Sequence, residues 1–176
     1  MINIENRLLA VRVLEPWAVE VMRNLYQSCK PWLEVSGPLP NRTAEEQQAW
    51  WNEMPHPKVA YLYVDIDKPW EFIAFSIIQR KGSFSTPIFA IHPAQHRRGL
   101  GEVILRHYLQ VADGPLAGSD KLSNGAIVHL NDRNGWQVLE IQDGVRKMFH
   151  PGVHNDRQQE IYDEIMRYHG ISNGGQ

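Results

Sequence analysis

A basic, glycine-containing turn that separates an apolar segment from an amphipathic one constrains this 176-residue chain more than any other feature. The apolar residues end at Ile91-His92-Pro93, two arginines follow within His96 to Gly101, and a helical pattern of apolar residues begins at once. Proline after an apolar run and two closely spaced glycines predict that a strand ends here and a tight turn follows. The sequence therefore predicts a strand, a turn and a helix in direct succession.

Such a junction has the properties of an anion-binding site. The first backbone N–H groups of a helix have no partner within the helix, and the helix dipole favours negative charge there. Gly99 and Gly101 leave the backbone open to close approach, while Arg97 and Arg98 add fixed positive charge. A basic loop that only caps a core helix would carry similar residues, so the rest of the chain decides between the two interpretations.

Apolar patterning predicts alternating strands and helices around the turn. Strands are expected over residues 8–14, 59–65, 71–79, 84–91, 126–130 and 145–149. Helices are expected from Pro16 to about Pro31, from a capping box of Thr43 and Glu46 to Trp51 or Met54, and over residues 100–112, 135–141 and 155–168. Residues 170–176 are expected to be a flexible tail.

Composition excludes several classes of protein. Hydrophobic residues make up 43% of the chain, charged residues 22%, and the formal net charge is −2, which argues against a disordered chain and against a strongly basic nucleic-acid binder. No apolar run approaches the roughly 20 residues that cross a bilayer. No secretory signal segment is recognised, and the single cysteine, Cys29, excludes an intramolecular disulfide. We therefore expect a soluble, cytoplasmic protein with no membrane partner, and nucleic acid is not the favoured partner.

The sequence carries no signature of a metal site or of a serine hydrolase. No predicted helix contains His-x-x-x-His, no cysteine pair exists, and His150 and His154 lie in a predicted loop. A Gly-x-Ser-x-Gly elbow is also missing. No metal is therefore expected.

The junction resembles the cofactor turn of the GNAT superfamily of N-acetyltransferases. In that family the fourth strand ends in an apolar-x-Pro segment and leads into a turn of pattern (Gln or Arg)-x-x-Gly-x-(Gly or Ala). Residues Arg97 to Gly101 match this turn, whereas His96 stands where the family has Gln or Arg. The resemblance implies that residues 1–176 form a single acyl-CoA N-acyltransferase domain of the α/β (α+β) class. Its mixed, mostly antiparallel sheet would have about six strands flanked by helices, and the C-terminal helix would be an addition.

The resemblance also implies acetyl-CoA as co-substrate. Family members hold its pyrophosphate with the backbone amides of the turn more than with side chains. The implied cofactor contacts are Ile91, His96, Arg97, Arg98, Gly99, Leu100, Gly101 and Asn134. Many members carry a tyrosine that protonates the leaving thiolate, seven residues after an asparagine that touches the cofactor. If Asn134 is that asparagine, Ile141 stands at the tyrosine position, and the usual general acid is missing.

Transfer of an acetyl group to an amine requires a base that takes the amine proton. His129 is a candidate, because the predicted strand 126–130 would lie beside the gap that the family opens between its fourth and fifth strands, and imidazoles titrate near neutrality. A histidine packed in the core is the alternative. His92, at the end of strand 84–91, is a second candidate or else a residue that structures the loop. Glu71 could act through a water molecule or simply be solvated.

The acceptor would be a primary amine of a small molecule or a protein. Several tryptophans could line an apolar or cation-binding pocket or serve as core residues, namely Trp32, Trp50, Trp51, Trp70 and Trp136. Two other functions stay open: a catalytically degenerate GNAT-fold protein that acts as a binding or assembly component, and a transferase of another acyl group or a modifier of nucleic-acid bases. The helix over 155–168 could cover the sheet edge or pair with a second subunit in a homodimer.

Overall fold

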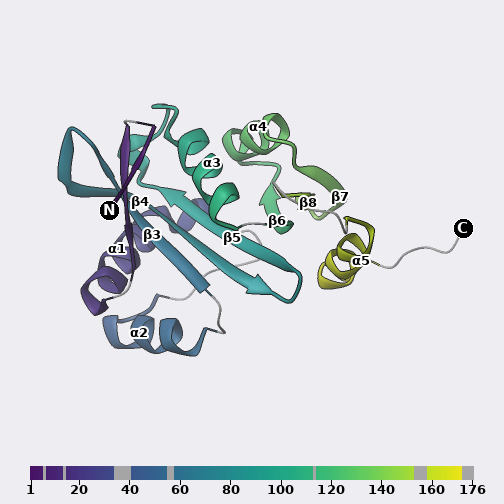
Figure 1. The fold of residues 1–176 in the computed structure, drawn as a ribbon, viewed down its shortest axis with the longest axis horizontal. Coiled ribbons are helices and arrows are strands. Elements are labelled where there is room, and N and C mark those ends of the chain that lie inside the picture. The colour runs from purple at the N-terminus through teal and green to yellow at the C-terminus, as the bar shows by residue number, and fades with distance from the viewer. Residues whose placement is uncertain are drawn as a thin grey trace, which may run out of the picture. The chain divides into compact units, whose positions relative to one another are not determined.

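The computed structural model describes residues 1–5, 7–13, 15–33, 41–54, 58–112, 114–152 and 158–171. Its strands form one eight-stranded, mostly antiparallel sheet with the order β1-β2-β3-β4-β5-β6-β8-β7 (Figure 1). The strands are β1 (Ile2–Ile4), β2 (Leu8–Arg12), β3 (Lys58–Asp65), β4 (Lys68–Lys81), β5 (Phe84–Ile91), β6 (Leu116–Lys121), β7 (Gln137–Gln142) and β8 (Val145–His150). The helices are α1 (Pro16–Leu33), α2 (Ala44–Glu53), the 3₁₀ turn η1 (Pro93–Gln95), α3 (Leu100–Ala112), α4 (Gly125–Arg133) and α5 (Gln158–Tyr168).

The chain forms two compact units. The first comprises residues 1–79 and 88–108, and the second comprises residues 80–87 and 109–176. The glycine turn lies in the first unit.

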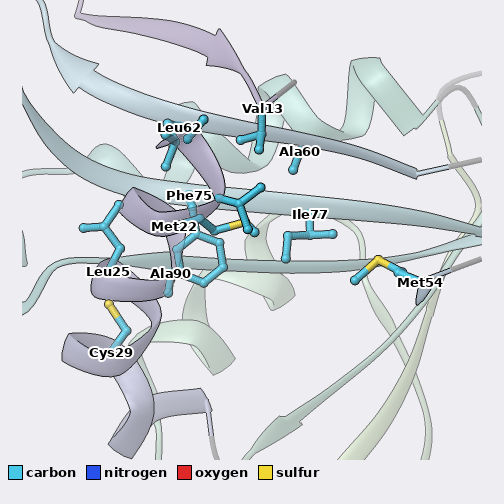
Figure 2. Packing of buried hydrophobic residues seen from close by; sticks show 12 residues of the cluster. Val13, Met22, Leu25, Cys29, Met54, Ala60, Leu62, Phe75, Ile77 and Ala90 are labelled. Atoms are coloured by element: carbon cyan, nitrogen blue, oxygen red, sulfur yellow. The ribbon is translucent and has the colours of Figure 1, made fainter. Parts of the chain in front are cut away.

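The first unit has a sheet with a helix on each face. Strands β1 to β4 pair antiparallel in sequence, and the buried core lies between them and α1. Figure 2 shows Met22 and Leu25 of α1 directed toward Leu62 and Phe75 of the strands. Because successive side chains of a strand point to opposite faces, Tyr63 next to Leu62 faces the other way and contacts α3.

The second unit packs α5 on a smaller set of strands. β8 pairs antiparallel with both β6 and β7, and β5 pairs in parallel with β6 at Ser85 and Leu116. The core of this unit consists of Phe84, Ala117, Phe149, Ile161 and Ile165. The apolar residues of α5 are therefore buried within the unit, as expected of a helix that covers the sheet. The homodimer through this helix stays a prediction.

Most of the predicted elements are confirmed. Strands form over 8–12, 58–65, 68–81, 84–91 and 145–150, and helices over 16–33, 44–53, 100–112 and 158–168. The capping box is present, because Thr43 N–H donates to Glu46 Oε2 (2.8 Å) and Glu46 N–H donates to Thr43 Oγ1 (3.2 Å). Residues 172–176 of the expected tail lie outside the described residues.

Two predicted elements are wrong, and both lie in the second unit. Residues 126–130, predicted as a strand, belong to α4, whose N-terminus is capped by the Asn124 side chain accepting from Ile127 N–H (3.4 Å). Residues 135–141, predicted as a helix, lie largely in β7, which continues through an Asp143-Gly144 turn into β8. Both turn residues have positive φ, 52° and 74°, so Asp-Gly makes a hairpin that the apolar pattern alone does not reveal.

The sheet has eight strands rather than about six, because β1, β6 and β7 were not predicted, whereas the strand predicted over 126–130 is part of a helix. In the strand order of the resembled family the fifth strand is β6 (Leu116–Lys121), where no strand was predicted because Gly, Ser and Asp are rare in strands. Within the described residues, no helix is long and apolar enough to span a membrane.

Candidate functional site

The predicted junction between strand and helix is present in the first unit. β5 ends at Ile91, and His92 N–H donates to Ile73 O (2.8 Å) on β4. The His92 Nδ1 atom accepts from Ala94 N–H (3.3 Å), which caps η1 and fits the loop-structuring role predicted as one alternative. The chain then turns through Arg97 (φ 64°) and Gly99 (φ 72°) into α3. Both lie in the left-handed region, which costs an arginine more than a glycine.

Side chains from three places in the sequence brace this turn. The Arg98 guanidinium donates to Asp65 Oδ2 (2.7 Å) at the end of β3 and to Gln95 Oε1. Gln95 in turn donates from Nε2 to Glu71 Oε1 (3.3 Å) on β4. His96 Nε2–H donates to Ile91 O (3.0 Å), since a carbonyl oxygen only accepts. Arg98 and His96 therefore hold the shape of the turn with their side chains.

Asp65 holds the Arg98 side chain as an ionised carboxylate. The side chain is buried, and its pKa lies below the ordinary value because Asp67 N–H and then the Arg98 guanidinium stabilise the charged form. Asp67 N–H donates to Asp65 Oδ1 (3.1 Å), so each carboxylate oxygen has its own donor. The contact with Arg98 therefore persists throughout the neutral pH range.

The exposed side of the turn has the chemistry of an anion site. By helix geometry the N–H groups of Gly99, Leu100, Gly101 and Glu102 have no acceptor within α3. Arg97 is exposed beside them, whereas Leu100 is buried and anchors the helix start. Unpaired amides, a helix N-terminus and an exposed arginine fit the phosphates of a nucleotide.

Arg7, which sequence reasoning missed, also belongs to this turn. It lies in the turn between β1 and β2, and its Nη2 donates to Arg98 O (2.6 Å) across 91 residues of sequence. Nothing in the local sequence around Arg7 indicates this contact, because it depends on β2 lying beside β3.

The candidates for the general base belong to different units. Glu71 and His92 lie in the same unit as the turn, and Glu71 contacts it through Gln95. His129 lies in the second unit on α4 and is exposed, so its predicted place on a strand is wrong. The cause is the helical spacing of Ile127, Val128 and buried Asn131, which the local Ile-Val content concealed. The catalytic roles of Glu71, His92 and His129 stay predictions.

The predicted place of Asn134 is also corrected. It does not begin the helix after the fifth strand but ends it, with Nδ2 donating to Leu130 O (2.8 Å). The asparagine at the start of that helix is Asn124, and seven residues later stands Asn131 instead of Ile141. Asn131 is buried, and its Nδ2 donates to Asp120 Oδ2 (2.9 Å). α4 contains no tyrosine, and both the missing general acid and a cofactor contact from Asn134 stay predictions.

Each candidate tryptophan whose side chain the structure describes has its own surroundings. Arg42 lies over Trp50 (4.9 Å) and Lys58 over Trp51 (4.8 Å), so these two ring faces already hold cations of the chain itself. Trp136 is buried against Gly118, and the Trp32 side chain lies outside the described part of the structure. Trp70 is 76% exposed on β4, next to Glu71.

Solved structures with the same fold are numerous, although no protein-family model and no curated protein matches the sequence. The spermidine N-acetyltransferase from Vibrio cholerae in complex with CoA and spermine superposes with a TM-score of 0.69 at 14% identity, covering 84% of this chain and 97% of that one. The GNAT-family acetyltransferase from Streptococcus pneumoniae gives 0.61 at 17% identity, covering 82% and 98%. The chain has the GNAT fold.

A third solved structure contains the cofactor. The Salmonella typhimurium yncA protein with its cofactor acetyl-CoA has a TM-score of 0.68 at 11% identity, covering 86% of this chain and 97% of that one. The fold and the order of elements around the glycine turn thus agree with the GNAT resemblance of the sequence. In the described ranges, no three His, Cys, Asp or Glu side chains gather as a metal site.

Proposed function

We propose that this protein is an N-acetyltransferase that moves the acetyl group of acetyl-CoA to a primary amine by direct transfer. The observation that carries the proposal is the braced glycine turn from His96 to Gly101 at the start of α3, in a chain with the GNAT fold. When bound, acetyl-CoA supplies the acetyl group as a thioester.

The residues of the first unit have separable roles in this proposal. The amides of Gly99, Leu100 and Gly101 bind the pyrophosphate, and Arg97 adds positive charge beside them. Arg98 holds the turn in place through its ion pair with Asp65, so its side chain has a partner whether or not a ligand is bound. Glu71 or His92 accepts the amine proton, directly or through one water molecule.

Cofactor binding is tested by calorimetry and by thermal shift with acetyl-CoA. A ligand at a hundredfold excess over its dissociation constant raises stability by about 2.7 kcal/mol. The Gly99→Glu variant should abolish the shift, because a carboxylate at this position repels phosphate. Gly144→Glu is the matched control: Gly144 also has a positive φ (74°), is exposed, and has open space around it. No shift in the unaltered protein, or an equal shift in Gly99→Glu, would refute the cofactor site.

The acceptor is tested by release of free CoA thiol across a panel of amines. Spermidine and spermine belong in it because one protein of the same fold is a spermidine N-acetyltransferase bound to spermine. Amino acids, aminated sugars and peptides with free N-termini extend the panel to other primary amines. Thiol release with any of them, together with the acetylated product by mass spectrometry, supports the proposed activity.

The base is tested by three single variants, Glu71→Gln, His92→Gln and His129→Ala. Loss of the base should lower kcat by on the order of 10² or more with little change in the affinity for acetyl-CoA. Each variant that keeps full turnover removes its residue from the candidates.

A binding or assembly component on the same fold is the second candidate, and one observation favours it. Asn131, at the position of the family tyrosine, is buried and engaged with Asp120, so α4 offers no phenol that could protonate a thiolate from this position. Cofactor binding without turnover across the whole panel would support this candidate over the enzyme.

A further inference from the structure

A guanidinium from the N-terminal hairpin reaches the backbone of the glycine turn. The main chain of Arg7 is held at both ends, since its N–H donates to Ile4 O (3.0 Å) and its carbonyl accepts from Ile66 N–H (3.2 Å). Its Nη2 donates to Arg98 O (2.6 Å). Its Nη1 lies 3.6 Å from the point that a Cβ atom would occupy at Gly99. Arg7 thus covers one side of the peptide that joins Arg98 to Gly99.

The bonded carbonyl determines where the Gly99 amide points. The C=O of residue 98 and the N–H of residue 99 belong to one planar trans peptide and point in opposite directions. A donor on Arg98 O therefore directs Gly99 N–H to the side away from Arg7. If this peptide rotated by half a turn, a carbonyl oxygen would replace the N–H on that side and would repel an anion.

Glycine makes such a rotation easy. A peptide rotates in place by compensating changes of ψ at the first residue and φ at the second, and glycine accepts either sign of φ without steric penalty. Gly99 has a φ of 72°, and a residue with a side chain would resist many of the alternatives open to it. The side-chain contacts of Arg98 with Asp65 and Gln95 hold its guanidinium but leave its own carbonyl unconstrained.

We propose that Arg7 is a positioning residue for phosphate binding: it holds the peptide between Arg98 and Gly99 with the Gly99 N–H directed outward to the anion. The inference rests on the proposed function, because it assigns the turn to the phosphates of acetyl-CoA. Arg7 acts from the carbonyl side of the peptide and so acts through Gly99 rather than by direct contact with phosphate.

Two readouts on the same variants test this role. The first is the dissociation constant of CoA by calorimetry at several salt concentrations. The second is the Gly99 amide in the CoA-free protein, followed by ¹⁵N relaxation dispersion, which detects exchange between peptide orientations on the microsecond to millisecond scale. The variants are Arg7→Met, which keeps length without donors, and Arg7→Lys, which keeps one donor group and the charge. Arg12→Met on β2 is the control for loss of an exposed arginine.

Arg7→Met should weaken CoA binding by on the order of tenfold, as loss of a hydrogen bond from a charged donor does, and should introduce exchange at Gly99. Arg7→Lys should retain part of the CoA affinity and show less exchange at Gly99 than Arg7→Met. Arg12→Met should change neither the CoA affinity nor the Gly99 amide. Thermal unfolding of each variant identifies any that fails to fold, and Arg7→Lys then carries the test.

Unchanged CoA affinity and an unchanged Gly99 amide in Arg7→Met would overturn the proposal. The proposal would also be overturned if Arg7→Met bound CoA more weakly and with less dependence on salt but showed no exchange at the Gly99 amide. Arg7 would then contact phosphate directly. If the unaltered protein binds no CoA, the proposed function fails, while the Gly99 amide still reports whether Arg7 holds the peptide.

Discussion

A buried ion pair in the second unit should make replacement of Asp120 by asparagine strongly destabilising. Asp120 on β6 and Arg146 on β8 have side chains only 4% and 5% exposed. Arg146 donates from Nε to Asp120 Oδ1 (2.8 Å) and from Nη2 to Oδ2 (2.7 Å), and Asn131 of α4 donates to the same Oδ2 (2.9 Å). The carboxylate therefore connects two strands and a helix.

The expected cost of Asp120→Asn follows from this geometry. Asparagine has almost the same volume, so no cavity forms, but a buried guanidinium loses its fully buried counter-charge and an amide N–H₂ faces other donors. Removing one partner of a buried pair costs about 3–5 kcal/mol. Arg146 retains Asp132 at 2.6 Å, whose side chain is 53% exposed, so the lower end of the range applies and we expect about 3 kcal/mol.

The assay is urea denaturation at neutral pH followed by circular dichroism, with the slope of the transition compared between variants. A double-mutant cycle with Arg146→Met isolates the pair, and the double variant should be less destabilised than the sum of the singles by about 2 kcal/mol. A loss below about 1 kcal/mol in Asp120→Asn, the value of an exposed pair, would contradict a stabilising role for this buried ion pair.

Three further predictions concern other parts of the chain. Burial lowers the pKa of His107 below 6.5, so the contribution of its neutral ring to the free energy of unfolding should be fully present above pH 6.5 and should be lost as the pH falls toward the folded pKa. In denaturation curves measured over a pH series, His107→Asn should make the decrease in stability over this range less steep. Gly118→Ala should cost about 1–3 kcal/mol, because its Cβ would lie 2.9 Å from Trp136 Cζ3, whereas Gly125→Ala, with open space at its Cβ, should leave the melting temperature equal or higher. An equal loss in both glycine variants would contradict this. Arg97→Gly should remove the backbone strain of an arginine at a φ of 64°, so the melting temperature should be no lower. CoA binding by this variant should be weaker and less dependent on salt. Unchanged binding by this variant would exclude Arg97 from the phosphate site.

The sequence predicted the first unit far better than the second. Strands β3 and β4 of this unit are long apolar runs, and α2 begins with a capping box, so local pattern and tertiary structure agree in these elements. In the second unit they conflict. β6 reads Leu-Ala-Gly-Ser-Asp-Lys, and it becomes a strand because Leu116 to Lys121 pair with β8 and because Asp120 finds Arg146 there. Neither β8 nor Arg146 is near β6 in the sequence.

The turn from His96 to Gly101 likewise depends partly on neighbouring residues and partly on contacts between residues far apart in the chain. Glycines at 99 and 101, proline at 93 and the apolar spacing of residues 100–112 by themselves determined a strand, a tight turn and an exposed helix N-terminus, because each acts through the backbone within a few residues. The sequence could not show that Arg98 is held by Asp65, that Glu71 reaches the turn through Gln95, or that Arg7 bonds to the Arg98 carbonyl. Those contacts join residues far apart in the chain, and only the pairing of the strands brings them within hydrogen-bond distance.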